Sequence, residues 1–313
     1  MARAQQRKRS LVVIVEARTV HVGTFTPSVV LDVARRTGRL AELGVEVAEH
    51  PVTSSPAQFA ALQDGSLDLA VTSPDNVLLY AGFDANPLRG RLPLTITAAL
   101  DRGLGLSLWT RPGIGLSEAR VFGVDVAVSG FAIAARALLT SLGVDTDALE
   151  TLPLGSTPQR RVALTAGVCD VTILGSGNEL RAEEDGCRRV ASVGQLGDYL
   201  GAVACRLTTA APRNARDADA VAGALVDTGA EIAAGRHDAL AVSAAERLLG
   251  LSPASARRHL DVLRSPQTGV VAGGRLERTA LLTLAGLRRG LQPAESLTAA
   301  VDLLLETASG RAT

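Results

Sequence analysis

Aromatic residues and lysine are scarce in this 313-residue chain. Lys8 is its only lysine, and phenylalanine, tyrosine and tryptophan together make up 3% of the residues. The few large rings, among them Phe25, Phe131, Trp109 and Tyr199, limit how large a ring-stacked ligand the protein can hold. Acidic and basic residues balance to a formal net charge of zero, so no whole-protein field attracts nucleic acid.

Cysteine and histidine are too few and too scattered to indicate a metal centre. The three cysteines, Cys169, Cys187 and Cys205, are odd in number and lack CxxC spacing, which argues against a disulfide framework and against a zinc site. The four histidines are dispersed along the chain as well. We therefore expect no metal and no cofactor.

Long hydrophobic runs are also missing. No run approaches the ~20 apolar residues of a membrane-spanning helix, so we expect no membrane span. Residues 11–15, Leu-Val-Val-Ile-Val, follow a basic start but are too few for the apolar part of a signal peptide. We expect them to form the first β-strand. The chain as written is expected to be cytoplasmic, or periplasmic if an export signal lies upstream.

A repeated phrase is the main architectural signal. Residues 54–76 read SSPAQFAALQDGSLDLAVTSPDN, and about a hundred positions later residues 156–178 read STPQRRVALTAGVCDVTILGSGN. Gly65, Asp68 and Asn76 recur at the matching places of the second copy. Each copy predicts a Ser/Thr-Pro helix start, a short helix, a glycine stop, an apolar strand and a polar loop. Such a long period indicates two related α/β lobes rather than a solenoid.

The length of the chain is enough for two hydrophobic cores. We expect a first lobe made of residues 1–100 and 206–313, and a second lobe made of residues 101–205. Beyond Leu207 the chain becomes rich in alanine and leucine, which predicts helices, interrupted by a hairpin around Val270–Leu276. These C-terminal helices are expected to pack on the first lobe.

Small polar side chains gather where the predicted strands give way to helices. In open α/β sheets, ligands bind outside the carboxyl ends of strands, where helix N-termini present unpaired N–H groups. Serine and threonine are also ordinary helix caps, so only their recurrence in both lobes favours a binding role. The candidates at these positions are Thr24, Thr26, Ser54, Ser55, Ser73, Asn76, Ser129, Ser156, Thr157, Ser176 and Asn178.

Arg18 and His21 are the charged candidates, in the loop predicted after the first strand. Arg18 could clamp a carboxylate, sulfonate or phosphate, and His21 could donate a hydrogen bond or transfer a proton. A solvent-facing arginine and a structurally satisfied histidine are the alternatives. Asp68 and Asp170 are predicted to be turn and helix-end residues, not a catalytic carboxylate pair.

The run from Phe25 to Asn76 resembles the first lobe of the nitrate/sulfonate/taurine-type (thiamine-precursor-like) substrate-binding proteins of ABC transporters. Gly38-Arg39-Leu40, Gly44 to Val47 and Ala61 to Ala70 match phrases of that family. The run GVDVAVSGFAIAARALLTSLGVD continues the resemblance, which covers about residues 11–206. It implies a type II periplasmic-binding-protein fold: two α/β lobes, a two-strand hinge, and C-terminal helices returning to the first lobe.

The resemblance also implies a function. A small anionic or polar metabolite, such as a carboxylate, a sulfonate or a phosphorylated compound, would lie between the lobes, and hinge closure would trap it. The ligand loops of the family correspond here to Thr24, Phe25, Ser54, Ser73, Asn76, Ser129 and Ser176. To these ligand-binding candidates we add Phe131 and Asn178.

Two other functions stay open as alternatives. Cytoplasmic relatives of this fold include enzymes such as aromatic desulfinases, lyases and decarboxylases. The loop Thr24-Phe25-Thr26 lacks the desulfinase cysteine, and an enzyme would have Arg18 orienting a carboxylate with His21 as acid or base. The stretch 245–265 resembles a helix-turn-helix of a DNA-binding regulator, yet acidic residues offset its arginines, so we expect no nucleic-acid partner. The sequence leaves open whether two copies form a homodimer.

Overall fold

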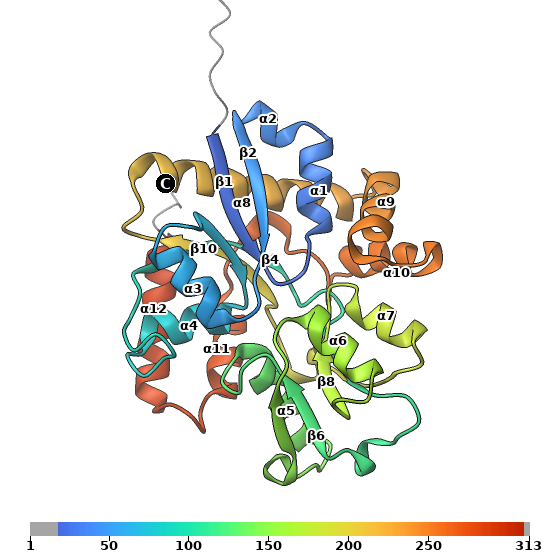
Figure 1. Ribbon diagram of the computed structural model, residues 1–313. Helices are drawn as coiled ribbons and strands as arrows, with labels where there is room; N and C mark the ends of the chain where they lie inside the picture. Colours follow the sequence, from blue (N-terminus) through green and yellow to red (C-terminus); the bar gives the residue numbers. More distant parts are fainter. Residues whose placement is uncertain (1–17, 310–313) are drawn as a thin grey trace, which may run out of the picture.

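The computed structural model describes residues 18–309, which form two α/β lobes (Figure 1). In the first sheet the strand order is β2-β1-β3-β10-β4; β1 is parallel to β2 and β3, whereas β10 is antiparallel to β3 and β4. Its strands are β1 (Arg18–Thr24), β2 (Val45–Pro51), β3 (Leu69–Thr72), β4 (Leu94–Asp101) and β10 (Ala202–Leu207).

The second sheet repeats this plan. Its order is β7-β6-β8-β5-β9, with β6 parallel to β7 and β8, and with β5 antiparallel to β8 and β9. In both sheets the fourth strand is therefore the antiparallel one. The strands are β5 (Ser107–Thr110), β6 (Val121–Val124), β7 (Glu150–Pro153), β8 (Val171–Leu174) and β9 (Arg188–Ser192). The internal duplication read from the sequence extends to the topology of the two lobes.

The first described strand differs from the prediction. Residues 11–15, the expected first strand, lie outside the described residues, and residues 18–24, expected as a loop, form β1. β1 alternates along its length: Val20 and Val22 are fully buried, while Thr19 and His21 on the other face are partly exposed. Such period-2 alternation is typical of a strand, and it is hidden when only continuous apolar runs are sought.

Asp68 and Asp170 hold equivalent places in the two lobes. Asp68 Oδ2 accepts a hydrogen bond from the backbone N–H of His21, and Asp170 Oδ2 accepts from those of Arg120 and Val121. Asp68 thus ties the turn before β3 to the middle of β1, and Asp170 ties the turn before β8 to the beginning of β6. Both aspartates therefore lie in the turns where the sequence predicted them.

Serine residues begin the helices that follow the strands. The side chains of Ser28, Ser54, Ser73 and Ser129 each accept a backbone N–H of the first turn, as N-caps do. Ser156 forms a capping box with Gln159. The helices are α1 (Val29–Arg36), α2 (Arg39–Glu42), α3 (Ser55–Gln63), α4 (Pro74–Gly82), α5 (Gly130–Ser141), α6 (Thr157–Thr165) and α7 (Asn178–Glu184).

The chain crosses between the lobes twice, after β4 and again before β10. The two crossings touch, since a Cβ atom at Gly201 would lie 2.2 Å from the backbone N and Cα of Gly103. Residues 202–205 were expected in the second lobe, but they belong to β10 and pair with β3 and β4 of the first sheet. The second sheet accordingly ends with β9, and the expected limit at residue 205 is too late.

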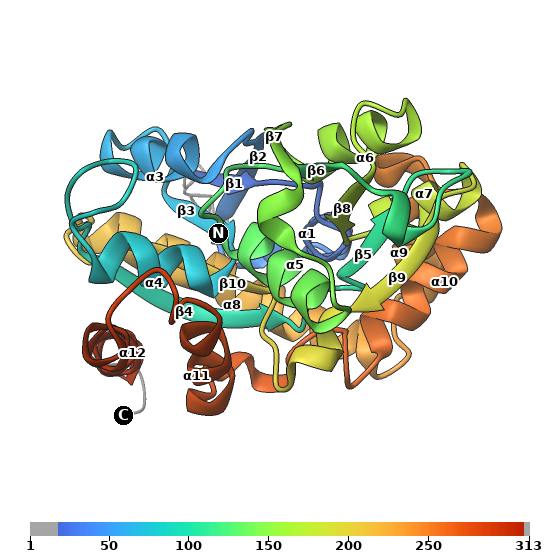
Figure 2. The ribbon, with the colours of Figure 1, turned by 90° about the horizontal axis from the view of Figure 1, so that it is seen from below.

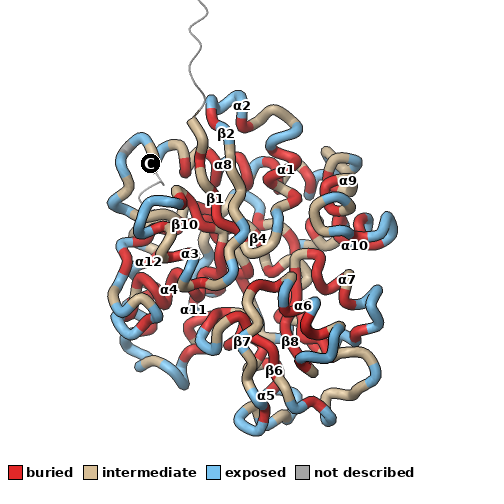
Figure 3. Tube along the Cα trace, in the orientation of Figure 1, coloured by how far each residue is buried: buried red, intermediate tan, exposed pale blue. Residues whose placement is uncertain are grey.

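The C-terminal helices pack on the first lobe (Figure 2). α12 lies against α4 and β4, where Val301 and Leu304 join the core of the first lobe. α8 covers the opposite face of that sheet, and α11 also reaches the second lobe through Leu284. The helices are α8 (Pro212–Ala233), α9 (Asp238–Leu249), α10 (Pro253–Arg264), α11 (Arg278–Leu287) and α12 (Ala294–Ser309). Buried residues follow the strands and the inner helix faces (Figure 3).

The hairpin expected around Val270–Leu276 does not form. Ala272–Gly274 is a 3-10 turn with Gly273 at φ 72°, and the only strand-like pairing there is an isolated bridge between Val270 and Asp101. The two glycines were read as a hairpin turn. In the structure they instead continue an irregular segment between α10 and α11.

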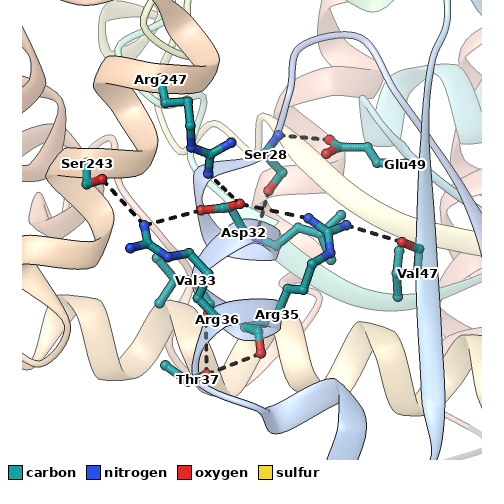
Figure 4. Close-up of polar contacts among 12 residues, drawn as sticks. Ser28, Asp32, Val33, Arg35, Arg36, Thr37, Val47, Glu49, Ser243 and Arg247 are labelled. Carbon is teal, nitrogen blue, oxygen red and sulfur yellow. Dashed lines mark hydrogen bonds and ion pairs between the residues drawn. The ribbon is translucent and has the colours of Figure 1, made fainter.

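A charged cluster joins α9 to α1 (Figure 4). Asp32 of α1 is buried, and its Oδ1 lies 2.7 Å from Nη2 of Arg247 on α9. Arg35 and Arg36 lie 3.9 and 3.8 Å from the same carboxylate, and Arg36 also donates to Ser243 of α9. The Arg247–Asp32 ion pair and the Arg36–Ser243 hydrogen bond therefore join α9 to α1.

Candidate ligand-binding site

The loops at the carboxyl ends of β1, β3, β6 and β8 face one another across the boundary between the lobes. They enclose a cavity of about 130 Å³, which the first residues of α1, α4, α5 and α6 also line. Thr26 and Thr157 are among its wall residues. Of the predicted ligand-binding residues, the cavity wall contains Thr24, Phe25, Ser73, Asn76, Ser129, Phe131 and Ser176.

Arg18 and His21 do not line the cavity. Arg18 lies at the amino end of β1, where it pairs with Asp68 at 2.9 Å and with Asp217 at 2.8 Å. The Nδ1 atom of His21 lies 2.8 Å from Nε2 of His50 on β2. The expectation that both residues follow the first strand is wrong, because β1 begins at Arg18 and the cavity lies beyond its carboxyl end at Thr24.

Ser54, Ser55 and Asn178 also lie outside the cavity wall. Ser54 caps α3, and Ser55 is buried in the first turn of that helix. Asn178 contacts the wall, because its Nδ2 donates to Oγ1 of Thr26, a wall residue, at 3.4 Å. The repeated asparagine of the second lobe therefore shapes the site through a neighbour.

The two repeated asparagines reach across the cleft in opposite directions. Asn76 of the first lobe accepts a hydrogen bond from the backbone N–H of Gly130 in the second, at 3.4 Å. Asn178 of the second lobe donates to Thr26 of the first. At this contact the lobes are tightly packed, since a Cβ at Gly130 would lie 2.6 Å from Oγ of Ser73.

Arg288, at the end of α11, makes a third link between the lobes. Its Nε and Nη2 donate to the two carboxylate oxygens of Asp75 on α4, both at 2.6 Å. Nη2 also donates to the backbone carbonyl of Val128 in the second lobe at 2.8 Å. Nothing in the local sequence around Arg288 indicated this contact, because its partners lie more than 150 residues away.

Arg160 places a buried guanidinium in the cavity wall. It is the second-lobe counterpart of Gln58, and both side chains donate to the backbone of the strand behind their helix: Gln58 to Val71, Arg160 to Ile173. Arg160 also donates to Gly155 O at 2.6 Å, and its Nε has no partner among the described residues. Burial lowers the pKa of Arg160, whereas the charge of nearby Asp125 raises it.

Two aspartates complete the charged groups of the wall. Asp125 accepts a short hydrogen bond from the hydroxyl of Ser129. Asp101 lies where β4 enters the first crossing, and its Oδ1 accepts from the backbone N–H of Gly103 at 2.8 Å. Burial raises the pKa of Asp101 to about 6, opposed by hydrogen bonds from the N–H groups of Gly103 and Ala202. Hydrogen bonds from the protein itself therefore use part of the acceptor capacity of the Asp125 and Asp101 carboxylates.

Glu49 holds the loop that precedes α1. Its Oε1 accepts from the hydroxyl of Thr24 and from the backbone N–H of Ser28, both at 2.8 Å. Burial raises the pKa of Glu49, and these two hydrogen bonds lower it. Glu49 lies on β2 and outside the cavity wall, and it fixes the side chain of Thr24, which lines the cavity.

His259 of α10 enters the cavity wall from the C-terminal helices. Its side chain is 2% exposed, and its Nδ1 has no hydrogen-bond partner in the described part of the chain. Burial lowers the pKa of His259 to about 4, so the imidazole is neutral at pH 7. In the sequence this residue was read only as part of a helix-turn-helix-like stretch.

α9 and α10 do form a helix–turn–helix pair, joined at Gly250, but the expected hairpin after them is absent. Arg258 pairs with Glu183 of α7 at 2.6 Å, and His259 points inward. Within residues 18–309 no three metal-binding side chains cluster, none of the cysteines lines the cavity, and no helix has the length and hydropathy to span a membrane.

No protein-family model and no curated protein matches the sequence of this chain. Solved structures do match its fold. The alkanesulfonate-binding protein of Xanthomonas axonopodis pv. citri, bound to MOPS, is 18% identical, with a TM-score of 0.69 over 92% of this chain and 95% of its own. The periplasmic nitrate-binding protein of Synechocystis PCC 6803 is 15% identical, with a TM-score of 0.69 over 95% and 89%.

A third match is the periplasmic aliphatic sulphonate-binding protein of Escherichia coli, 14% identical, with a TM-score of 0.63 over 86% of this chain and 90% of its own. These matches extend over both lobes and the C-terminal helices. Together with the two matching sheets and the double crossing, they identify the architecture: the chain has the two-lobe fold of the periplasmic binding proteins.

Proposed function

We propose that this protein binds a small anionic or polar metabolite between its lobes. The observation that carries the proposal is Arg160, which is 1% exposed in the cavity wall and whose Nε lacks a partner among residues 18–309. A buried charge is costly unless it is paired and hydrogen-bonded. An oxygen of a carboxylate, sulfonate or phosphate group is the strongest acceptor for a guanidinium.

The other groups in the wall are compatible with such a ligand. Asp125 and Asp101 already accept hydrogen bonds from Ser129 and Gly103, which reduces their repulsion of an anion. The N-termini of α5 and α6 add the positive ends of two helix dipoles. Two of the similar structures are named as an alkanesulfonate-binding and a nitrate-binding protein, and both of these ligands are small anions.

We include closure of the lobes in this proposal. The bonds of Asn76 to Gly130, Asn178 to Thr26 and Arg288 to Val128 all connect the two lobes, and all would break on opening. A ligand that contacts both lobes stabilises the closed state by its extra affinity for it. Small-angle X-ray scattering should show a smaller radius of gyration with ligand; an unchanged radius would argue against closure.

The binding test uses a thermal-shift panel of nitrate, sulfonates, carboxylates and phosphorylated metabolites. Arg160→Gln should weaken binding of any hit at least tenfold, because a hydrogen bond to a charged group contributes about 1.5–3 kcal/mol. Arg161→Gln is the matched control, since Arg161 pairs with Asp185 instead. A panel without hits, or a hit that Arg160→Gln binds as tightly as the wild type, would contradict the proposal.

The enzyme alternative has a simple test as well. Arg18 and His21, its proposed catalytic residues, do not line the cavity. We therefore expect a panel hit to be recovered unchanged after incubation with the protein. A new mass in the mass spectrum would favour the enzyme.

We also propose that the protein acts outside the cytoplasm. The similar nitrate-binding and sulphonate-binding proteins are both described as periplasmic. Fractionation of cells that express the complete gene should place the protein with periplasmic or secreted material. Recovery in the cytoplasmic fraction would instead support the other expectation.

A further inference from the structure

Residues of α1, of the first crossing and of the C-terminal part of the chain give the cavity an apolar part that differs from the polar loops. A set of wall residues belongs to the same hydrophobic cluster as the buried residues of α9 and α10, and together they form what we call the apolar wall. These residues are Val29, Val30, Leu104, Leu249, Leu263 and Val270. An apolar wall favours a ligand that has an apolar body.

His259 is the polar exception beside this wall. The imidazole is 2% exposed, and its Nδ1 has no hydrogen-bond partner within residues 18–309. A neutral imidazole carries one donor and one acceptor, and burial without a partner costs free energy. Because the described part of the protein does not satisfy Nδ1, a group that enters the cavity is the available partner for this imidazole.

Arg160 and His259 reach the cavity from different parts of the molecule. Arg160 lies on α6 of the second lobe, and His259 lies on α10 of the C-terminal helices. This inference rests on the proposed function. We infer that the site has two ends, and that its ligand is an anion with an apolar body and a second, uncharged hydrogen-bonding group that His259 recognises.

The second group has to be uncharged because the apolar wall holds no counter-ion for it. A second anionic group beside Leu249 and Leu263 would be buried without a partner, which is strongly unfavourable. The volume limits the ligand too. A cavity of about 130 Å³ corresponds to on the order of ten water-sized sites, and so to roughly ten non-hydrogen atoms.

Isothermal titration calorimetry with matched probes tests the inference. The probes are hexanoate, 6-hydroxyhexanoate, adipate, hexane-1-sulfonate and 6-hydroxyhexane-1-sulfonate. For the better of the two head groups, the hydroxylated probe should bind about three- to tenfold more tightly than the plain chain, as one added hydrogen bond predicts. Adipate, with its second charge, should bind most weakly.

Variants of His259 show whether this residue causes the preference. In His259→Leu the hydroxylated and plain probes should bind equally, whereas His259→Gln, which keeps a donor and an acceptor, should retain part of the preference. Arg257→Gln is the control, because Arg257 is on the exposed side of the same helix. A preference that survives in His259→Leu, tightest binding by adipate, or no binding of any probe would overturn the inference.

These outcomes separate the inference from the proposed function. A panel hit that depends on Arg160, together with no hydroxyl preference, would overturn only the two-ended site. A panel without any hit that depends on Arg160 would overturn both.

Discussion

Replacing Arg288 by methionine tests the buried link between α11, α4 and the second lobe. The side chains of Arg288 and Asp75 are 1% and 2% exposed, and two hydrogen bonds of 2.6 Å join them. Arg288 also holds the carbonyl of Val128 across the cleft at 2.8 Å. Methionine keeps an unbranched apolar stem but removes every one of these donors.

The expected loss follows from these contacts. Breaking a buried ion pair by removing one partner costs about 3–5 kcal/mol, because the other charge stays buried without compensation. The lost hydrogen bond to Val128 adds about 1 kcal/mol. We therefore expect Arg288→Met to lower the free energy of unfolding by about 4–6 kcal/mol, a large share of the roughly 5–15 kcal/mol typical of a folded protein.

Urea unfolding followed by circular dichroism measures this loss. Arg289→Met is the matched control, since Arg289 is exposed and a surface change typically alters stability by about 0.5 kcal/mol or less. The double variant Asp75→Asn/Arg288→Met removes the uncompensated charge and should be more stable than Arg288→Met alone. A loss below about 1 kcal/mol, or a double variant less stable than the single one, would refute the reasoning.

Three further changes test other contacts of the structure. Gly201→Ala places a Cβ 2.2 Å from the backbone of Gly103, so its urea midpoint should fall, whereas Gly223→Ala, with open space around it, should not; equal midpoints would contradict the close crossing. Gly130→Ala should prop the lobes apart, weakening the binding of a panel hit with little change in unfolding free energy; unchanged affinity would count against closure. Burial raises the pKa of Glu179 from 4.5 to about 8, so the folded protein keeps a proton that the unfolded chain releases. Stability should therefore fall between about pH 4.5 and pH 8, by up to about 1.4 kcal/mol per pH unit, and Glu179→Gln should flatten this fall; identical pH profiles would refute the assignment.

The repeated phrase predicted more of the molecule than any single residue did. Because both copies carry the same helix start, glycine stop and strand, they indicated two related lobes, and the strand orders of the two sheets are equivalent. The polar loops after β3 and β8 could be found in the same way. Asn76 lines the cavity and Asn178 contacts its wall, since carboxyl ends of parallel strands meet at one edge of a sheet.

The sequence failed to predict some of the site residues for two kinds of reason. Arg160 is a cation on an amphipathic helix, and such a residue ordinarily faces solvent; its burial, which it shares with the aligned Gln58, is seen only in the structure. His259 and Arg288 come from the C-terminal helices, whose position on the lobes depends on tertiary packing rather than on local pattern. Arg18 and His21 were expected in a loop, whereas residues 18–24 form β1.

The fourth strand of the first sheet, β10, comes from late in the sequence, and this affects the order in which the chain can fold during synthesis. All strands of the second sheet come from residues 107–192, so that sheet can pair as soon as this stretch has emerged. The first sheet cannot join β3 to β4 until Ala202–Leu207 arrives between them. During synthesis, β3 and β4 are therefore made first, but their facing edges stay unpaired while the strands of the second sheet can already pair with one another.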